Sequence, residues 1–215
     1  MSWDWNVVED FMPRFWDGVL VTLQALVMGS LIAFTLGLFW ALAQRSRRRW
    51  VSWTVSGVTE FIRSTPLLVQ LFFLFYVVPE WGPSMSPLTT GIIGLGLHYS
   101  TYTAEVYRAG IDGVPTGQWE AATALSLPTA HTWRAVILPQ AIRRVVPALG
   151  NYVVAMLKDS PMIAVIGAFE MLGEAQAYSN ETFTTEAITV IGIAFILIAY
   201  PASLLTRALE RRLVR

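Results

Sequence analysis

The chain has 215 residues, of which 54% are hydrophobic and 14% are charged. Soluble globular domains carry about 25% charged residues, so this composition excludes an ordinary soluble protein and indicates an integral membrane protein. The 15 basic and 15 acidic residues give a net charge of zero, which gives no support to nucleic-acid binding. The absence of cysteine excludes disulfides, thiolate metal sites and thiol nucleophiles.

Five stretches are predicted to be transmembrane helices, because a helix rises about 1.5 Å per residue and the hydrocarbon core is about 30 Å thick. They are residues 19–43, 51–78, 88–104, a stretch within 145–168, and 187–206. The second contains Glu60, Arg63 and Pro66, and the fourth contains Lys158 and Asp159. We therefore expect an all-α integral membrane protein with about five transmembrane helices, forming a single domain over residues 1–215.

Charged residues between the spans predict the orientation. If the spans alternate, three segments share one side of the membrane and contain Arg45, Arg47, Arg48, Arg49, Arg108, Arg134, Arg143, Arg144, Arg207, Arg211, Arg212 and Arg215. Loops rich in Arg and Lys stay in the cytoplasm, whereas the segments on the other side are rich in Asp and Glu. The N-terminus is therefore predicted outside and the C-terminus inside.

The first 18 residues combine aromatic and acidic side chains, including Trp3, Trp5, Phe11, Phe15 and Trp16. This mixture predicts an interfacial segment, residues 1–18, on the outer surface of the membrane. It lacks the basic start of a cleavable signal peptide. We interpret its aromatic residues as membrane anchors.

A hydrophilic stretch at residues 107–147 is too long for a simple connection between two helices. Within it, residues 117–127 predict a short helix that begins at Gly117 and ends before Pro128. Ala121 and Ala122 follow Glu120 and make one helix face nearly flat, so another protein's backbone can approach while Glu120 meets a basic group. Alone, this pattern is equally typical of an amphipathic surface helix.

Catalytic and metal-binding motifs are missing from the sequence. There is no HExxH, GxSxG or Walker A motif, and the two histidines, His98 and His131, fall on opposite sides of the predicted topology. We therefore expect neither an enzyme nor a metal site, and no cofactor bound by this chain.

Several motifs in a fixed order resemble the permease subunits of bacterial ABC importers, in the branch that transports polar amino acids. Glu120, Ala121 and Ala122 occupy the positions of the family's EAA loop, and Ser126 stands where the family usually has Gly. Residues 63–70, 137–139, 147–151 and 158–160 resemble further motifs of the branch, which commonly reads Thr-Ser-Leu at 160–162. The resemblance covers nearly the whole chain, and it is greatest to ectoine and hydroxyectoine permeases.

This resemblance implies a type I importer fold in a multi-pass protein of the bacterial cytoplasmic membrane. It also implies a second permease subunit, identical or homologous, a cytoplasmic ABC ATPase dimer that binds ATP and Mg²⁺, and an extracytoplasmic solute-binding protein. The transported small molecule would be a polar amino acid or a related zwitterion, moved by alternating access. The residues expected to couple the chain to the ATPase are Gly117, Glu120, Ala121, Ala122, Leu125 and Ser126.

Charged residues at membrane depth cost about 2.5–3.5 kcal/mol each and therefore suggest function. Glu60 and Arg63 are three residues apart on one helix and can pair, while Arg63 can also brace the kink at Pro66. Lys158 and Asp159 point in different directions, so each needs its own partner. An intramembrane ion pair across the permease pair is one interpretation. The other places Asp159 and Ser160 in the translocation site, because the helix loosens before Pro161.

Six further residues are substrate-path candidates: Gln70, Phe73 and Val77, at i, i+3 and i+7 of the second span, and His98, Tyr99 and Tyr102 of the third. Aromatic rings beside a carboxylate can hold a delocalised cation, although helix packing explains each ring equally well. Two other function classes are a self-sufficient secondary transporter or channel and a membrane anchor that recruits a cytoplasmic enzyme. The first leaves the EAA-like loop without a use, and the second leaves the intramembrane charges unexplained.

Overall fold

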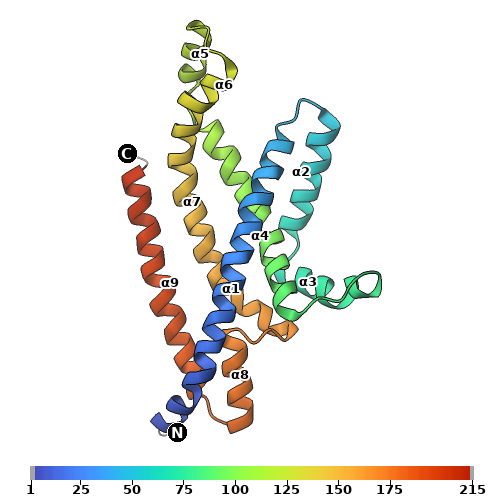
Figure 1. Cartoon of the computed structure of the whole chain (residues 1–215), viewed down its shortest axis with the longest axis vertical. Coiled ribbons are helices and arrows are strands. Elements are labelled where there is room, and N and C mark those ends of the chain that lie inside the picture. Colours follow the sequence, from blue (N-terminus) through green and yellow to red (C-terminus); the bar gives the residue numbers. More distant parts are fainter. Residues whose placement is uncertain (1–2, 214–215) are drawn as a thin grey trace.

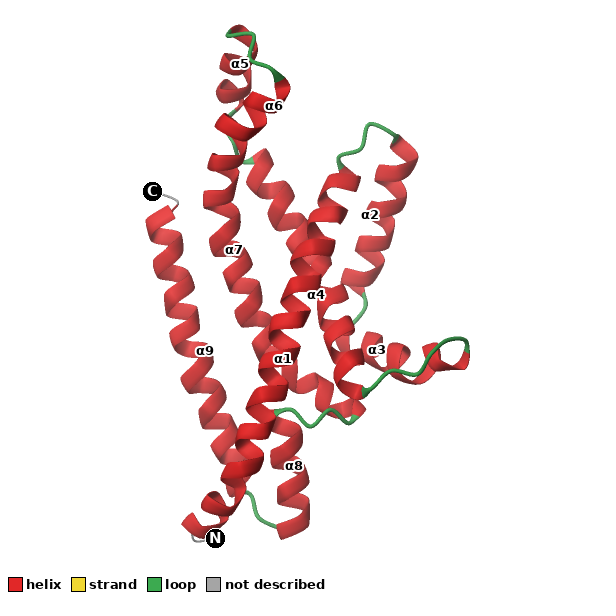
Figure 2. Ribbon diagram, in the orientation of Figure 1, coloured by secondary structure: helices red, strands yellow, loops and turns green. Residues whose placement is uncertain are grey.

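The structure is a computed structural model that describes residues 3–213, and this range forms helices and connecting loops without a strand (Figures 1 and 2). The α-helices are α1 (Trp5–Gln44), α2 (Arg49–Ser64), α3 (Leu67–Phe72), α4 (Pro87–Asp112), α5 (Thr116–Ala124), α6 (Thr129–His131), α7 (Leu138–Asp159), α8 (Met171–Thr182) and α9 (Glu186–Leu213). Two π-helical segments, η1 (Phe73–Val77) and η3 (Thr132–Ile137), and two 3₁₀ segments, η2 (Val78–Glu80) and η4 (Ser160–Ile166), continue neighbouring helices.

The first helix begins earlier than predicted. Asp4 caps α1 by accepting a hydrogen bond from the Asn6 backbone N–H at 2.9 Å. From Trp5 onward, the expected interfacial segment is the first part of this 40-residue helix and not a separate element; residues 1–2 lie outside the described residues. Phe11 is fully buried against Tyr178 of α8, so its interpretation as a membrane anchor is wrong, because α8 and α9 cover that part of α1.

The helix α4 lies at the centre of the bundle, packed against α1, α2, α3 and α7. A Cβ added to Gly37 of α1 would lie 2.0 Å from Thr103 Oγ1, and one added to Gly96 of α4 would lie 2.6 Å from Ile32 Cγ2. Glycine therefore sets how closely α1 and α4 can approach. Leu71 and Leu95 are fully buried beside this crossing.

Each predicted span overlaps helical segments of the structure. Three segments, Trp5–Gln44, Thr129–Ile166 and Glu186–Leu213, are long and apolar enough to cross a membrane, and the pair Arg49–Ser64 and Leu67–Glu80 can be a fourth span. The 26-residue α4 is long enough for a fifth but less apolar. Five of its polar side chains are buried: Thr90, His98, Ser100, Thr101 and Thr103. A helix surrounded by protein does not need a lipid-compatible surface.

The predicted span 51–78 is sharply bent. Its two parts meet at 101° around Pro66, which lacks an N–H and forces Thr65 into an extended conformation. The side-chain Nε2 of Gln70 donates hydrogen bonds to the carbonyls of Ile62 (2.7 Å) and Thr65 (2.9 Å). These bonds satisfy backbone acceptors that the bend removes from the helix, and α3 extends sideways from the bundle (Figure 1).

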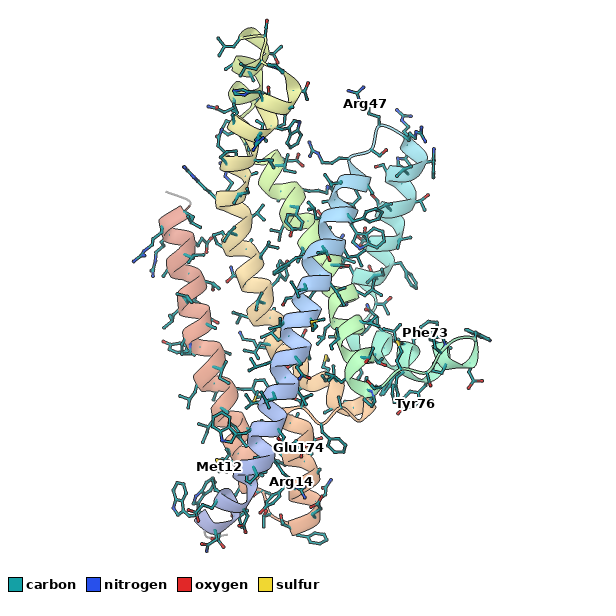
Figure 3. The ribbon with its side chains drawn as sticks, viewed as in Figure 1. Met12, Arg14, Arg47, Phe73, Tyr76 and Glu174 are labelled. Carbon is teal, nitrogen blue, oxygen red and sulfur yellow. The ribbon has the colours of Figure 1, made fainter. Side chains whose placement is uncertain are left out.

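The two chain ends lie at opposite ends of the molecule (Figure 1). The start of α1 and the helix α8 lie at one end of the molecule. The helices α5 and α6 and the loop between α1 and α2 lie toward the other end. Arg47 marks that loop in Figure 3. Two of the basic segments predicted to be cytoplasmic therefore gather at the same end, as does the C-terminal end of α9. Arg215 lies outside the described residues.

Candidate functional site

The predicted coupling helix is present as α5, which spans Thr116–Ala124 and ends earlier than the expected residue 127. It forms the tip of the molecule, beside α6 (Figure 1). Trp119 packs edge-on against Trp133 of η3, with ring centroids 5.3 Å apart. The two rings cover a buried cluster that contains Ile111 and Ile137. These contacts hold α5 against the ends of the long helices instead of leaving it as a free loop.

One face of α5 is exposed and available to a partner. Gly117, Glu120 and Ala121 are exposed, and Leu125 has 72% of its surface accessible. Ala122, in contrast, is only 4% exposed, because it faces the chain itself. Among the expected coupling residues, Ala122 therefore serves the packing of α5 through its small side chain.

Ser126, the residue that differs from the family pattern, lies at the end of α5. Ser126 has a positive φ of 51°, in the left-handed region that favours glycine. The Ser126 N–H donates to the Thr123 carbonyl (2.9 Å) and the Leu127 N–H donates to the Ala122 carbonyl (3.0 Å). This bond pattern is a Schellman motif, whose positive-φ position is usually glycine.

A second group of predicted residues meets at the centre of the bundle. The Tyr99 hydroxyl donates a 2.7 Å hydrogen bond to Asp159 Oδ2, which joins α4 to the end of α7. The rings of His98 and Tyr102 lie 5.2 Å apart and the rings of Tyr99 and Tyr102 lie 6.0 Å apart. The structure therefore brings together four of the eight substrate-path candidates, His98, Tyr99, Tyr102 and Asp159, and a fifth, Gln70, joins them through His98.

Tyr152 belongs to this group, although it was not predicted. Its ring centroid lies 5.7 Å from that of Tyr102 and 6.2 Å from that of Tyr99. Tyr152 precedes Asp159 by seven residues, and this i, i+7 spacing on one helix face is the signal that could have identified it. A carboxylate surrounded by phenol rings can bind an ammonium or amidinium group by charge and by cation–π contact.

Ser160 does not belong to the site. Its side chain is fully buried, and its hydroxyl donates to the Leu157 carbonyl at 2.8 Å. This bond satisfies an acceptor where α7 changes into the 3₁₀ segment η4 before Pro161. Ser160 therefore stabilises the break in the helix, and the carboxylate of its neighbour Asp159 is the group that faces the rings.

The predicted stripe of Gln70, Phe73 and Val77 forms only in part, because Gln70 and Phe73 line one cavity and Val77 does not line it. Residues Phe73–Val77 are π-helical, and the wider turn shifts the phase of every later residue. Gln70 still reaches the site, with Nε2 3.0 Å from His98 Nδ1. Gln70 and Phe73 also line, with Phe61 and Val69, a largely apolar cavity of about 320 Å³ at the α2–α3 bend. Figure 3 shows Phe73 beside Tyr76 on the arm that α3 extends.

The predicted ion pair between Glu60 and Arg63 is confirmed, and it is part of a larger network. Arg63 Nη1 also lies 3.4 Å from Glu105 Oε1, which is 3.2 Å from Arg108 Nη1. Lys158 was expected in an intramembrane ion pair, but among residues 3–213 no carboxylate lies within 4.0 Å of its ammonium group. Its side chain is exposed, so any ionic partner must come from outside the described chain.

A buried carboxylate lies outside both groups. Glu170 is fully buried and caps α8, with Oε1 accepting a 2.8 Å hydrogen bond from the Gly173 N–H. The Thr22 hydroxyl of α1 lies 3.5 Å from its other oxygen. Burial raises the pKa of Glu170 to about 7. Nothing local in the sequence indicates that α1 covers Glu170.

Comparisons with known proteins show the family to which the chain belongs. The family model for the inner membrane component of binding-protein-dependent transport systems matches residues 33–215. The chain is 44% identical over 200 residues to y4tG of Sinorhizobium fredii, a probable amino-acid ABC transporter permease protein, covering 93% of this chain and 87% of that protein. It is 34% identical over 214 residues to TcyB of Bacillus subtilis, an L-cystine transport system permease protein, covering 98% and 92%.

The solved structures agree on the fold. A chain from the crystal structure of an amino acid ABC transporter with histidines superposes with a TM-score of 0.92 at 34% identity, covering 99% of this chain and 100% of that chain. A chain of the inward-facing MetNI methionine ABC transporter shares the fold, with a TM-score of 0.80 at 20% identity and full coverage of both chains. The predicted type I importer fold is therefore confirmed. The chain belongs to the family of inner membrane components of binding-protein-dependent transport systems and is a permease subunit of an ABC transporter, a translocation component of the inner membrane and not an enzyme.

Proposed function

We propose that this permease imports a polar amino acid or a related small zwitterion across the cytoplasmic membrane, driven by ATP hydrolysis in a partner ATPase. The observation that carries the proposal is the exposed face of α5, with Glu120, Ala121 and Leu125 at the tip of the molecule. A short helix packed on the ends of long helices can transmit a movement of a bound cytoplasmic protein to those helices. ATP and Mg²⁺ would bind the ATPase and not this chain.

The substrate class follows from the chemistry of the central site. The Asp159 carboxylate accepts a hydrogen bond from Tyr99, whose ring lies in a cluster with those of Tyr102 and Tyr152. This arrangement suits a small molecule with an ammonium or amidine-like group. Amino acids fit this description, as do ectoine and hydroxyectoine. The relatives named for amino-acid and L-cystine transport support the same class.

The implied assembly contains two permease subunits, two ATPases and an extracytoplasmic solute-binding protein. The N-terminus of the chain would lie outside and the C-terminus in the cytoplasm, so that α5 faces the ATPase. Lys158, exposed and without a carboxylate partner in residues 3–213, would then face the second permease subunit.

Copurification followed by transport in liposomes tests the proposal. A tagged chain in mild detergent should bring down an ATPase and either a second permease or another copy of itself. Liposomes that hold this complex, supplied with its binding protein, should import at least one of L-arginine, L-glutamine, L-cystine, ectoine and hydroxyectoine when ATP is present on the ATPase side. A chain recovered alone, with uptake driven by an ion gradient, would indicate a secondary transporter. Capture of an unrelated cytoplasmic enzyme without uptake would indicate a membrane anchor.

A further inference from the structure

Four side chains of alternating charge connect α2 to α4. Glu60 pairs with Arg63 on α2, Arg63 Nη1 lies 3.4 Å from Glu105 Oε1, and Glu105 Oε1 lies 3.2 Å from Arg108 Nη1 on α4. The Arg63–Glu105 contact is the longest of these and joins two different helices. Neither side chain is enclosed, since 32% of Arg63 and 44% of Glu105 is exposed.

This ion chain continues the central site along one face of α4. His98, Tyr102, Glu105 and Asp112 follow one another at spacings of four, three and seven residues, which places them on the same face of a helix. Glu105 lies about 9 Å from Tyr99 along the helix axis, toward α5, at a rise of about 1.5 Å per residue.

An ion pair inside a membrane protein can open at a low free-energy cost only if both charges form new ion pairs. Removing one partner leaves an uncompensated charge at a cost of about 3–5 kcal/mol where the pair is buried. A zwitterion avoids this cost, because its carboxylate can meet Arg63 while its ammonium group meets Glu105. Every charge stays paired before, during and after the exchange.

We propose that the Arg63–Glu105 ion pair is a second binding site for the zwitterionic substrate, lying next to the Tyr99–Asp159 site on its α5 side and entered by exchange of ion partners. This inference rests on the proposed import function and adds a position that the substrate occupies before it leaves the chain. Glu105 and Arg63 then act on the substrate directly, instead of only holding α2 against α4.

The chain offers a matched control on the same helix. Asp112, seven residues beyond Glu105, forms an ion pair with Arg45 of α1, so it also ties α4 to a neighbouring helix. It lies about 10 Å further toward α5 at the helical rise. If these carboxylates act only as ties between helices, the loss of either charge should have similar consequences.

Kinetics of the complete transporter in liposomes test the proposal. The substrate in these measurements is the amino acid of the panel that the wild-type complex imports. Glu105→Gln should lower its maximal uptake rate by about tenfold or more, which corresponds to an increase in activation free energy of at least about 1.4 kcal/mol. The concentration of loaded binding protein that gives half-maximal uptake should stay near its wild-type value. Glu105→Asp should restore part of the rate. Asp112→Asn should import at nearly the wild-type rate, and both variants should melt at similar temperatures.

A labelling experiment provides a second readout, because the chain contains no cysteine. Ala109→Cys places a unique thiol at an exposed position one turn beyond Glu105 on the same face. Saturating amounts of the imported amino acid should suppress most of its labelling by a charged thiol reagent. The control Ser84→Cys, in the exposed loop before α4, should label equally with and without substrate.

Three results would overturn the inference. Wild-type uptake by Glu105→Gln would show that the substrate needs no carboxylate there. Equal losses of uptake and of melting temperature in Glu105→Gln and Asp112→Asn would show a structural tie only. A wild-type complex that imports no zwitterion of the panel would instead refute the proposed substrate class, and the second site with it.

Discussion

At the scale of single residues, Ser126 and Glu170 each occupy a position that their side chains disfavour. Ser126 adopts a left-handed backbone conformation at the end of α5, which costs about 1 kcal/mol relative to glycine. Glu170 keeps a carboxyl group fully buried at the start of α8. Both residues lie at helix ends, where backbone N–H and C=O groups need partners outside the helix. A substitution at each position should therefore have a measurable effect.

Replacing Ser126 with glycine should stabilise the end of α5. The change removes the Cβ that disfavours φ of 51°, so we expect a gain of about 1 kcal/mol without loss of the Schellman hydrogen bonds. Limited proteolysis of the 107–147 stretch should become slower. Ala124→Gly, inside the same helix end, is the control and should accelerate proteolysis. Faster cleavage of Ser126→Gly would contradict the assigned backbone conformation.

Glu170 should make the stability of the chain depend on pH. Burial raises its pKa from 4.5 to about 7 in the folded chain, so the folded state holds a proton that the unfolded state releases. The stabilisation is fully present below pH 4.5 and is lost as the pH rises through about 7, by up to about 3 kcal/mol. The melting temperature in detergent should therefore fall between pH 5 and pH 8. Glu170→Gln should flatten this dependence, whereas Glu9→Gln, at an exposed position, should leave it unchanged.

At the scale of helices, glycine contacts and helix breaks decide where the functional residues lie. The close crossing of α1 and α4 depends on positions where a side chain has no room. The bend at Pro66 turns α3 away from α2 and brings Gln70 to His98. The π-helical turn that follows directs Phe73 to the cavity at the bend. These contacts set the geometry around the central site.

Replacing Gly37 with alanine should disrupt the crossing of α1 and α4. The new Cβ would lie 2.0 Å from Thr103 Oγ1 and 2.8 Å from the Ser100 carbonyl, so the helices must separate. Overpacking of this kind typically costs about 1–3 kcal/mol, and the backbone contact puts this variant at the upper end. The matched control is Gly57→Ala in α2, where a Cβ meets no atom within 4 Å. The melting temperature should fall only for Gly37→Ala, and a fall of equal size in both variants would contradict the packing.

At the scale of the whole molecule, α5 is connected to both sides of the central site. The chain enters α5 from α4, which carries Tyr99, and leaves it through α6 and η3 into α7, which ends at Asp159. The hydrogen bond between Tyr99 and Asp159 therefore joins the two long helices that meet at the tip. A displacement of α5 acts on both helices at once, so it can change the site at a distance.

Replacing Ala121 with arginine should block transport without separating the permease pair. The position is exposed on the face of α5 proposed to contact the ATPase, and a long cation there prevents close approach. ATP-driven uptake should be abolished, as it should be for Glu120→Lys, while the second permease still copurifies. Ser84→Arg, in the loop at the other end of α4, is the control and should transport normally. Normal uptake by Ala121→Arg would refute the coupling role.

Much of the candidate site followed from local spacing along the sequence. The pairing of Glu60 with Arg63 depends only on an i, i+3 separation, and the short helix α5 was predicted from Gly117 and Pro128, although it begins one residue earlier, at Thr116. The contribution of Glu105 and Tyr152 could not be predicted in the same way, because their partners lie on other helices. Periodicity states which residues share a face, but not which helix that face meets.

The sequence by itself determined the class of protein, the approximate helices and the family, because hydrophobic length and motif order are properties of the chain alone. Only the tertiary structure decided that Ala122 and Ser160 are buried, that Phe11 is packed under α8 and that Asp159 meets Tyr99. A bend of 101° and a π-helical turn change the direction of every residue beyond them. Small local changes in backbone geometry therefore decide which side chains reach the site.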